Sequence, residues 1–166
     1  MSDAETVVRD LQPRLWRLGM ALGADSSTAE DLAQQVLIRL LTGRRIVLRT
    51  ADPWPYARRS LINAYVSHWR KQNRESPYGL SVEREAEGSL EDVVVQRAQI
   101  STLLSRLPPR QRALIVLRFY EGLTDPEIAQ VMRKPRSSVS SDLTRALQTM
   151  RNANQQSEDE AVVDRG

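Results

Sequence analysis

The sequence predicts an all-α protein made of two small helical domains joined by an acidic, flexible linker. Its apolar residues recur at helical spacing, and no stretch shows the strict alternation that is typical of a strand. Residues 107–151 read as helix, short turn, helix, tight turn and helix, which is a helix-turn-helix pattern. Basic residues gather in two blocks on either side of an acidic stretch. A chain of 166 residues has room for two such domains, each with a small core.

The first helix is predicted within residues 4–22. Its apolar stripe consists of Val7, Leu11, Leu15, Leu18 and Leu22. Pro13 interrupts this stripe, because proline has no N–H to donate, so the helix is expected to begin near Pro13 or to kink there. Gly23 is expected to end it.

A second helix is predicted from about residue 26 to Leu41. Ser26 or Ser27 is expected to cap it, and Gly43 to stop it. Its expected buried residues are Ala29, Leu32, Ala33, Val36 and Leu40.

A basic and apolar loop over residues 43–52 leads to a long helix, which Pro53 and Pro55 start and which runs to about Asn73. One side of this helix carries Trp54, Leu61, Tyr65 and Trp69. The polar side carries Arg59, Asn63, Ser67, Arg70 and Arg74. We interpret Trp54 and Tyr65 as core residues, whereas Trp69, beside Arg70, is equally suited to stacking on an unpaired base.

Residues 75–90 are predicted to be a linker, because one proline, two glycines and four acidic residues occur there with weak periodicity. Ser89 is expected to cap a helix over residues 90–106, which uses Val94, Ala98 and Leu104 among its apolar residues. After Arg151 the sequence is polar and acidic, so residues 152–166 are predicted to be a disordered tail.

Residues 107–151 carry the most informative pattern of the chain. Pro109 suits the first position of a helix. Thr124 with Glu127 forms a capping box, and Pro126 sits just inside the start of that helix. The apolar faces are supplied by Leu114, Leu117, Ile128, Val131 and Met132. The third helix is rich in Ser, Thr and Arg, as expected of a recognition helix that enters the major groove of DNA.

Composition excludes several classes of function. With no cysteine and one histidine, the chain has neither disulfides nor a thiolate or His-rich metal site, so no metal or other cofactor is predicted. Motifs of phosphate-binding loops, serine hydrolases and zinc proteases are absent, and acidic pairs such as Glu30–Asp31 suit helix starts, so no enzymatic activity is expected. No apolar run approaches the roughly 20 residues of a membrane span, and the N-terminus is not a signal peptide. We therefore expect a cytoplasmic protein without membrane insertion.

The distribution of charge says more than the net charge of +3. Residues 53–74 carry five basic groups and no acidic one, and residues 106–151 carry nine basic and four acidic groups. Between them, residues 75–92 carry six acidic groups and one arginine. This pattern indicates two nucleic-acid contacts on one chain. Ordinary solvated helix faces would give the same pattern, and charge alone does not separate the two interpretations.

An aromatic and basic helix, an acidic linker and a helix-turn-helix, in this order, resemble a bacterial sigma factor of the extracytoplasmic-function (ECF) group. The resemblance covers nearly all of residues 4–151. Its N-terminal part lies in TAEDLAQQVLIRLL and DPWPYARRSLINAYVSHWRKQNR, which are similar to region 2 of the family. Its C-terminal part lies in LPPRQRALIVLRFYEGLTDPEIAQVM and SSVSSDLTRALQTMR, which are similar to region 4.

This resemblance implies a division of the chain into four parts. Residues 1–74 would be a region 2-like helical bundle that binds core polymerase and the −10 element. Residues 75–90 would be the acidic linker, which threads the polymerase cleft. Residues 91–151 would be a region 4-like helix-turn-helix domain that binds the −35 element, and residues 152–166 the disordered acidic tail.

The resemblance also implies which residues of the first domain bind. The second helix would dock on the clamp coiled coil of core RNA polymerase through Asp31, Gln34, Gln35 and Arg39. The family often has an acidic residue where Gln35 stands. The loop 43–52 would hold a base flipped out of the −10 element, at a cost of a few kcal/mol. The −10 DNA would be read and opened by Arg59, Asn63, Ser67, Trp69, Arg70, Lys71 and Arg74.

For the second domain, the resemblance implies that the last helix enters the major groove at the −35 element. The implied DNA contacts are Arg136, Ser137, Ser138, Ser140, Ser141 and Arg145. Val139, Leu143 and Leu147 would form the core side of this helix.

The helix-turn-helix departs from the family pattern at four positions. The family commonly has glycine where Arg133 stands, a polar cap where Pro135 stands, and Lys or Arg where Ser140 and Asp142 stand. An aspartate there repels phosphate, although it can also accept a hydrogen bond from cytosine N4. We therefore predict weak or unusual −35 recognition, and a higher −35 affinity for Asp142→Arg.

Two other functions compete with promoter recognition by a sigma factor. One is a sigma-like competitor that binds polymerase without directing transcription, and the altered Ser140 and Asp142 favour it. The other is a free-standing helix-turn-helix regulator, which would usually dimerise, and no dimerisation helix is evident after residue 151. Members of the ECF group are often held by an anti-sigma factor, so the resemblance adds such an inhibitor to core RNA polymerase and promoter DNA as a partner.

Overall fold

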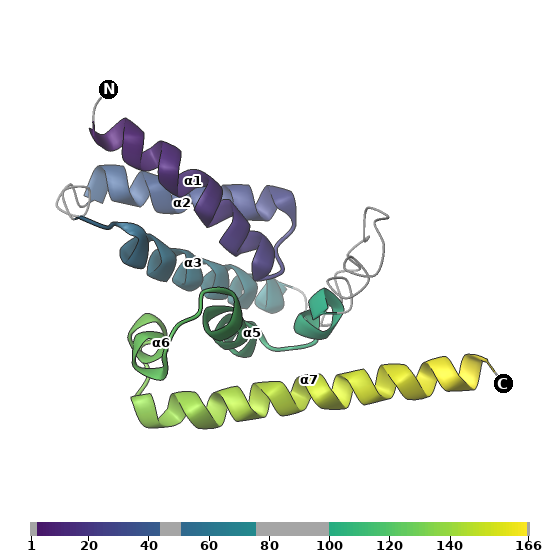
Figure 1. The fold of residues 1–166 in the computed structure, drawn as a ribbon. Helices are drawn as coiled ribbons and strands as arrows, with labels where there is room; N and C mark the ends of the chain where they lie inside the picture. The colour runs from purple at the N-terminus through teal and green to yellow at the C-terminus, as the bar shows by residue number, and fades with distance from the viewer. Residues whose placement is uncertain (1–2, 44–50, 76–99, 166) are drawn as a thin grey trace. The chain divides into compact units, whose positions relative to one another are not determined.

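The computed structural model describes residues 3–43, 51–75 and 100–165 and divides the chain into two compact units, residues 1–78 and 79–166 (Figure 1). No strand occurs in these described ranges, which confirms the all-α prediction. None of the described helices is long and apolar enough to cross a membrane. The expected base-holding loop, most of the linker and the predicted cap at Ser89 lie outside the described residues.

Three helices form the first unit: α1 (Asp3–Ala21), α2 (Ser26–Gly43) and α3 (Trp54–Glu75). The leucines predicted for α1 are buried, with Leu15, Leu18 and Leu22 fully inaccessible, and they meet Leu32, Val36 and Leu40 of α2 in one core. Tyr65 of α3 is also fully buried, and its hydroxyl donates a hydrogen bond of 2.8 Å to the carbonyl of Leu22. The predicted core positions of Trp54 and Tyr65 are therefore confirmed.

Of the two alternatives predicted at Pro13, a helix start is excluded, since α1 continues through this residue from Asp3. The proline is exposed, so its ring lies on the solvent side, and the carbonyl of Pro13 accepts a hydrogen bond of 3.2 Å from Nε of Arg17. A proline inside a helix costs about 3 kcal/mol, and burial of Leu11 and Leu15 on the opposite side offsets this cost.

The starts of α2 and α3 are capped by aspartates. Oδ1 of Asp25 accepts a hydrogen bond of 2.7 Å from the backbone N–H of Thr28, so the cap of α2 is Asp25 rather than the predicted Ser26 or Ser27. Oδ1 of Asp52 accepts a hydrogen bond of 3.0 Å from the N–H of Trp54 at the start of α3. Gly23, with φ +96°, follows the end of α1 as predicted.

The second unit is built around a helix-turn-helix. Residues 100–105 are helical and are followed by α5 (Pro109–Ile115), the π-helical turn η2 (Val116–Tyr120), α6 (Asp125–Met132) and α7 (Arg136–Asp164). The core of this unit consists of apolar side chains from all of these elements: Leu104, Leu107, Leu114, Leu117, Ile128, Val139, Leu143 and Ala146. α7 packs on α5 and on α6.

The structure corrects the prediction of a disordered tail, because α7 continues through residues 152–164. This stretch contains neither glycine nor proline and is rich in Ala, Gln and Glu, which favour helix. Ala153 is buried, and its carbonyl accepts hydrogen bonds from the hydroxyl of Ser157 (3.0 Å) and from Nη1 of Arg106 (3.4 Å). These contacts extend the packed part of the helix beyond Arg151.

Candidate polymerase and nucleic-acid interfaces

The outward face of α2 presents all four of the predicted polymerase-binding residues. Asp31, Gln34, Gln35 and Arg39 are exposed. Helical spacing places Ile38 at the centre of this face, and 58% of its surface is exposed, although the opposite side of α2 is buried. Ile38 is not among the predicted polymerase-binding residues. Its signal was an isoleucine lying out of phase with the buried stripe of the helix.

On α3, four of the predicted −10 residues share one face, because they are spaced by four, four and three residues: Arg59, Asn63, Ser67 and Arg70. Asn63, Ser67 and Arg70 are exposed, and Arg59 is half-buried. Lys71 is exposed at the edge of this face. Arg74 lies in the last turn of α3, and its side chain is outside what the structure describes.

Trp69 lies on a different side of α3 from this polar face. Its ring packs edge-on against Tyr65, with ring centroids 6.5 Å apart and an interplanar angle of 72°, and the side chain is half-buried. Trp54 is buried, and the guanidinium of Arg14 lies 4.0 Å from the centre of its ring. Trp69 is therefore braced by the core and still accessible along part of its surface, unlike Trp54 and Tyr65.

Arg112 joins the helix over residues 100–105 to α5, and it is buried with 4% of its surface exposed. Its guanidinium donates hydrogen bonds to the carbonyls of Leu104 (2.8 Å), Ser105 (3.1 Å) and Leu107 (3.1 Å). These carbonyls lie at and just beyond the end of the helix that contains residues 100–105, where the helix no longer supplies an N–H for each carbonyl. Arg112 is thus a buried cation that stabilises the connection between this helix and α5.

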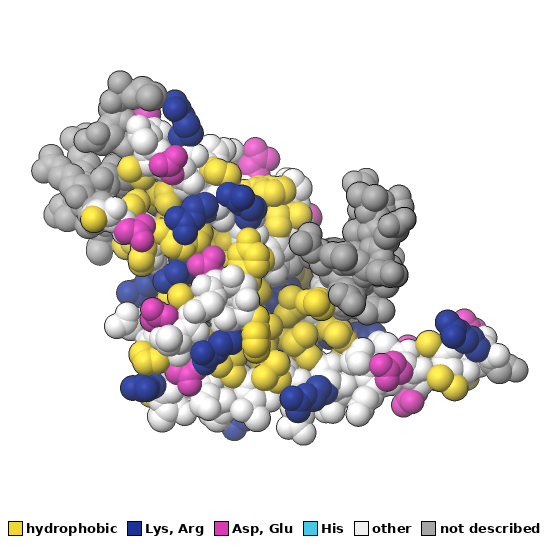
Figure 2. Space-filling model, viewed as in Figure 1, with side chains coloured by type: hydrophobic (Ala, Val, Ile, Leu, Met, Phe, Trp, Pro, Cys, Tyr) yellow, Lys and Arg dark blue, Asp and Glu magenta, His cyan; other side chains and the backbone are white. Residues whose placement is uncertain are grey.

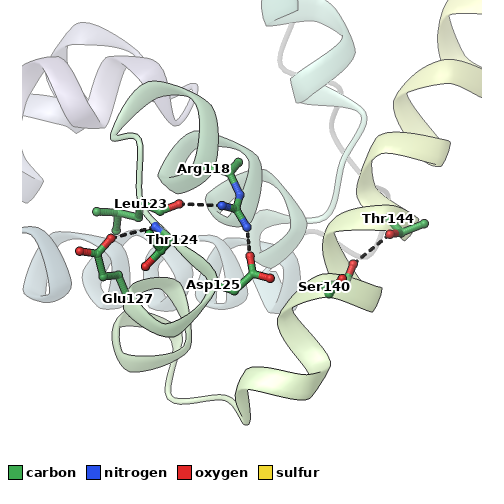
Figure 3. Close-up of polar contacts among 7 residues, drawn as sticks. All are labelled: Arg118, Leu123, Thr124, Asp125, Glu127, Ser140 and Thr144. Carbon is green, nitrogen blue, oxygen red and sulfur yellow. Dashed lines mark hydrogen bonds and ion pairs between the residues drawn. The ribbon is translucent and has the colours of Figure 1, made fainter.

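A second arginine fixes the turn between η2 and α6 (Figure 3). Arg118 donates a hydrogen bond of 3.0 Å to the carbonyl of Leu123 and forms an ion pair with Asp125. The predicted capping box is confirmed, with the N–H of Thr124 donating to Oε2 of Glu127 over 2.8 Å. Both interactions set the direction in which α6 leaves the turn.

The tight turn of the helix-turn-helix has an unusual residue at its tightest point. Arg133 has φ +52° and ψ +47°, the left-handed conformation that favours glycine. The next residue, Lys134, donates its backbone N–H to the carbonyl of Ala129 over 3.0 Å, and Pro135 begins α7 without a side-chain cap. The departures from the family pattern at Arg133 and Pro135 therefore fall where the backbone is most constrained.

The outward face of α7 is lined by neutral polar side chains. Ser137, Ser141, Thr144 and Gln148 are all exposed and follow helical spacing, and the exposed Arg136 and Arg145 flank them. Ser140 is exposed and Ser138 partly so, whereas Val139 and Leu143 are buried as predicted and Leu147 is half-buried. Thr144 was missing from the predicted contacts. Its hydroxyl donates a hydrogen bond of 2.9 Å to the carbonyl of Ser140 (Figure 3), as the hydroxyl of Ser141 does to Ser138 over 3.0 Å.

Asp142 forms an ion pair with Lys134 of the tight turn. Its Oδ2 lies 2.5 Å from Nζ of Lys134, and the two side chains are only 22% and 20% exposed. Farther along the same helix, acidic side chains gather toward the C-terminal end on the face seen in Figure 2. The acidic residues in this part of the helix are Glu158, Asp159, Glu160 and Asp164.

Two family matches cover both units. Residues 7–75 match the Sigma-70 region 2 family, and residues 97–150 match the Sigma-70, region 4 family. The RNA polymerase sigma-E factor of Streptomyces avermitilis is 33% identical over 153 residues, which cover 89% of this chain and 82% of that relative. The sigma-E factor of Streptomyces coelicolor is 33% identical over the same length, covering 89% and 83%.

A solved structure has the same fold. The sigma factor RpoE of Bartonella quintana, determined in complex with the anti-sigma factor NepR, matches with a TM-score of 0.68 over 93% of this chain and 98% of that chain, at 19% identity. The fold and the two family matches define a sigma factor, the promoter-recognition subunit of bacterial RNA polymerase. Within that class, the chain belongs to the extracytoplasmic-function group. As a sigma factor it binds core RNA polymerase and promoter DNA, and it is not an enzyme; a free-standing regulator or a competitor is not favoured.

Proposed function

We propose that this sigma factor uses three separate helix faces for three different binding contacts. The outward face of α2 binds core polymerase, the polar face of α3 binds and opens the −10 element, and the outward face of α7 contacts the −35 element. The observation that carries this division is the exposure of the residues concerned on helices whose other sides are buried. The proposed site of action is the cytoplasm, where polymerase and DNA are found.

The α2 face is suited to a protein partner. Ile38 supplies an exposed apolar centre, and Asp31, Gln34, Gln35 and Arg39 surround it with polar groups. Protein interfaces commonly have this arrangement of an apolar core within a polar rim. A few central residues usually carry most of the binding energy, so Ile38 is expected to dominate this contact.

The α3 face is suited to DNA that must be opened. Arg70 and Lys71 supply positive charge for phosphates, and the amide of Asn63 can donate to and accept from a base edge. Trp69, braced by Tyr65, offers the accessible part of an aromatic ring to an unpaired base. Because α3 carries no acidic residue before Glu75 at its last position, this face attracts rather than repels the DNA backbone.

The proposed partners include an anti-sigma factor. The support is the Bartonella quintana neighbour, which was solved with such an inhibitor, together with the exposed faces of α2 and α3, which an inhibitor would need to cover. Co-purification from native cells tests this part: recovery of polymerase subunits alone would count against a stable inhibitor.

The polymerase-binding face is tested by Ile38→Asp in the full chain. Placing a charge at the centre of an apolar contact is expected to weaken binding to core polymerase at least about tenfold and to reduce run-off transcription in proportion. Val163→Asp is the matched control, because Val163 is also exposed, at 80%, on a helix of the other unit. Unchanged binding by Ile38→Asp, with an unchanged thermal melt, would exclude the α2 face as the main contact.

A further inference from the structure

Lys134 and Asp142 form an ion pair that spans the helix-turn-helix. Lys134 belongs to the tight turn, and Asp142 lies in the second turn of α7. The Nζ–Oδ2 distance is 2.5 Å, and about four fifths of each side chain is shielded from solvent, at 20% and 22% exposure. This shielding makes the pair less sensitive to screening by salt than a fully exposed pair.

The position of the ion pair determines which cations of the helix-turn-helix remain available to contact DNA. The outermost stripe of α7 consists of Ser137, Ser141, Thr144 and Gln148, and Asp142 lies beside this stripe rather than on it. Asp142 therefore reaches back to the turn and neutralises a lysine that would otherwise lie next to the DNA-binding face. The exposed cations that remain near this face are Arg133, Arg136 and Arg145.

We propose that Asp142 is a positioning and specificity-determining residue of promoter recognition. Its carboxylate holds the partly shielded ammonium group of Lys134 against α7 and keeps it away from the phosphate backbone. The recognition helix then binds fewer phosphates, which carry no sequence information, and depends more on its hydroxyl and amide groups, which face the base edges. This inference rests on the proposed role of α7 in −35 binding.

Pairing with Lys134 changes the way in which Asp142 affects DNA binding. An unpaired carboxylate in the major groove would simply repel DNA, whereas a paired one lowers the affinity for every sequence by removing a lysine. Loss of Asp142 should therefore strengthen binding to DNA of any sequence and reduce the preference for the correct promoter.

The salt dependence of DNA binding by the full chain tests this directly. With a duplex of random sequence, the slope of log K against log salt changes by about 0.9 for each phosphate that the protein neutralises. Asp142→Asn is expected to steepen the slope by about one and to tighten binding at low salt. Asp142→Glu, which keeps the pair, is expected to retain the slope of the unmodified chain.

Lys134→Gln supplies the decisive comparison. In the Asp142→Asn background, where no carboxylate is left unpaired, it is expected to restore the slope of the unmodified chain. A steepened Asp142→Asn slope that Lys134→Gln leaves unchanged would show that the freed lysine does not bind phosphate and would overturn the inference. A merely structural role for the pair would change the melting temperature without changing the slope.

Arg145→Gln separates failure of the inference from failure of the proposed function. If α7 faces DNA, this variant makes the slope shallower by about one. No change with Arg145→Gln would place the DNA-binding surface elsewhere and would overturn both proposals. In run-off transcription on host DNA, Asp142→Asn holoenzyme is expected to add start sites with poor −35 elements, and an unchanged set of start sites would contradict the claim about specificity.

Discussion

Arg133 shows how a single residue is constrained by the turn that it occupies. With φ +52° and ψ +47°, it adopts a conformation that costs an L-residue other than glycine roughly 1–2 kcal/mol. The hydrogen bond from the N–H of Lys134 to Ala129 and the start of α7 at Pro135 hold the chain there. The left-handed conformation of Arg133 is thus maintained by the residues around the turn, because arginine itself does not favour this conformation.

Arg133→Gly is therefore expected to stabilise the second unit by about 0.5–1 kcal/mol, since the relief of strain exceeds the extra entropy of glycine in the unfolded chain. Gly122→Ala is the converse variant. Gly122 has φ +68° and no atom within 4 Å of an added Cβ, so a methyl group there adds backbone strain without a clash. Gly122→Ala should lower the free energy of unfolding of the second unit by about 1 kcal/mol. Urea unfolding followed by circular dichroism measures this change. Shifts of the same sign in both variants would contradict this account.

Individual functional residues could be predicted only in part from the sequence. Helical periodicity identified the exposed polar residues of α2, α3 and α7, because buried and exposed sides alternate regularly. It also places Ile38 out of phase with the buried stripe of α2, but residue type alone does not separate this isoleucine from its buried apolar neighbours. The pairing of Lys134 with Asp142 depends on the path of the tight turn, which spacing along the chain does not determine.

At the scale of the helices, the packing of α1 on α2 depends on a glycine. A Cβ built on Gly19 would lie 3.0 Å from the Cβ of Ala29 and 3.2 Å from its Cα. These distances are shorter than ordinary van der Waals contact, so a side chain at this position would require Ala29 to move away by a few tenths of an ångström. The close approach brings the leucines of both helices into one core.

Gly19→Ala is expected to destabilise the first unit by about 1 kcal/mol or more, because the cost of separating the helices exceeds the improvement of about 1 kcal/mol in helix propensity. Ala29→Gly in the same chain removes the opposing methyl group. The double variant should therefore regain much of the packing, although glycine in α2 costs helix propensity. Chemical denaturation of the single and double variants measures both effects, and a stabilised Gly19→Ala would show that the helices can separate without cost.

The helices were predictable to different degrees. The starts at Pro109 and Thr124 were identified, because capping boxes and prolines at first positions are local signals. The predicted start of α1 near Pro13 was wrong, because burial of leucines offsets the cost of the proline. The prediction of a disordered tail was also wrong, because residues 152–164 favour helix and a hydrogen bond between Ala153 and Arg106 holds them to the core. The π-helical turn η2 carries no signal in the periodicity of its residues.

At the scale of the molecule, each unit buries its own core. The first contains Leu15, Leu18, Leu40 and Tyr65, and the second contains Leu114, Leu117 and Ile128, all fully or almost fully inaccessible. The order of the domains was predictable from charge and motifs, because the acidic stretch separates two patterns of different kinds. The families found for residues 7–75 and 97–150 follow the same order.

Leu117→Ala is expected to lower the stability of the second unit by about 2–5 kcal/mol and to leave the first unit unaffected. The chain offers a simple readout, because all three tryptophans (Trp16, Trp54 and Trp69) belong to the first unit. Tryptophan fluorescence should therefore report an unchanged transition while circular dichroism reports an earlier loss of part of the helix. Leu18→Ala should shift the fluorescence transition, and a fluorescence shift in Leu117→Ala would show that the units unfold together.

The charge arrangement along α7 has a kinetic consequence. The helix is about 43 Å long at 1.5 Å per residue, with Arg136, Arg145 and Arg151 in its first part and the acidic residues from Glu158 to Asp164 at its far end. In the field of a DNA duplex, the first part is attracted and the far end repelled, so the helix experiences an electrostatic torque before contact. If α7 contacts the −35 element as proposed, encounters are expected to begin with its N-terminal part oriented toward the duplex, which raises the rate of productive association.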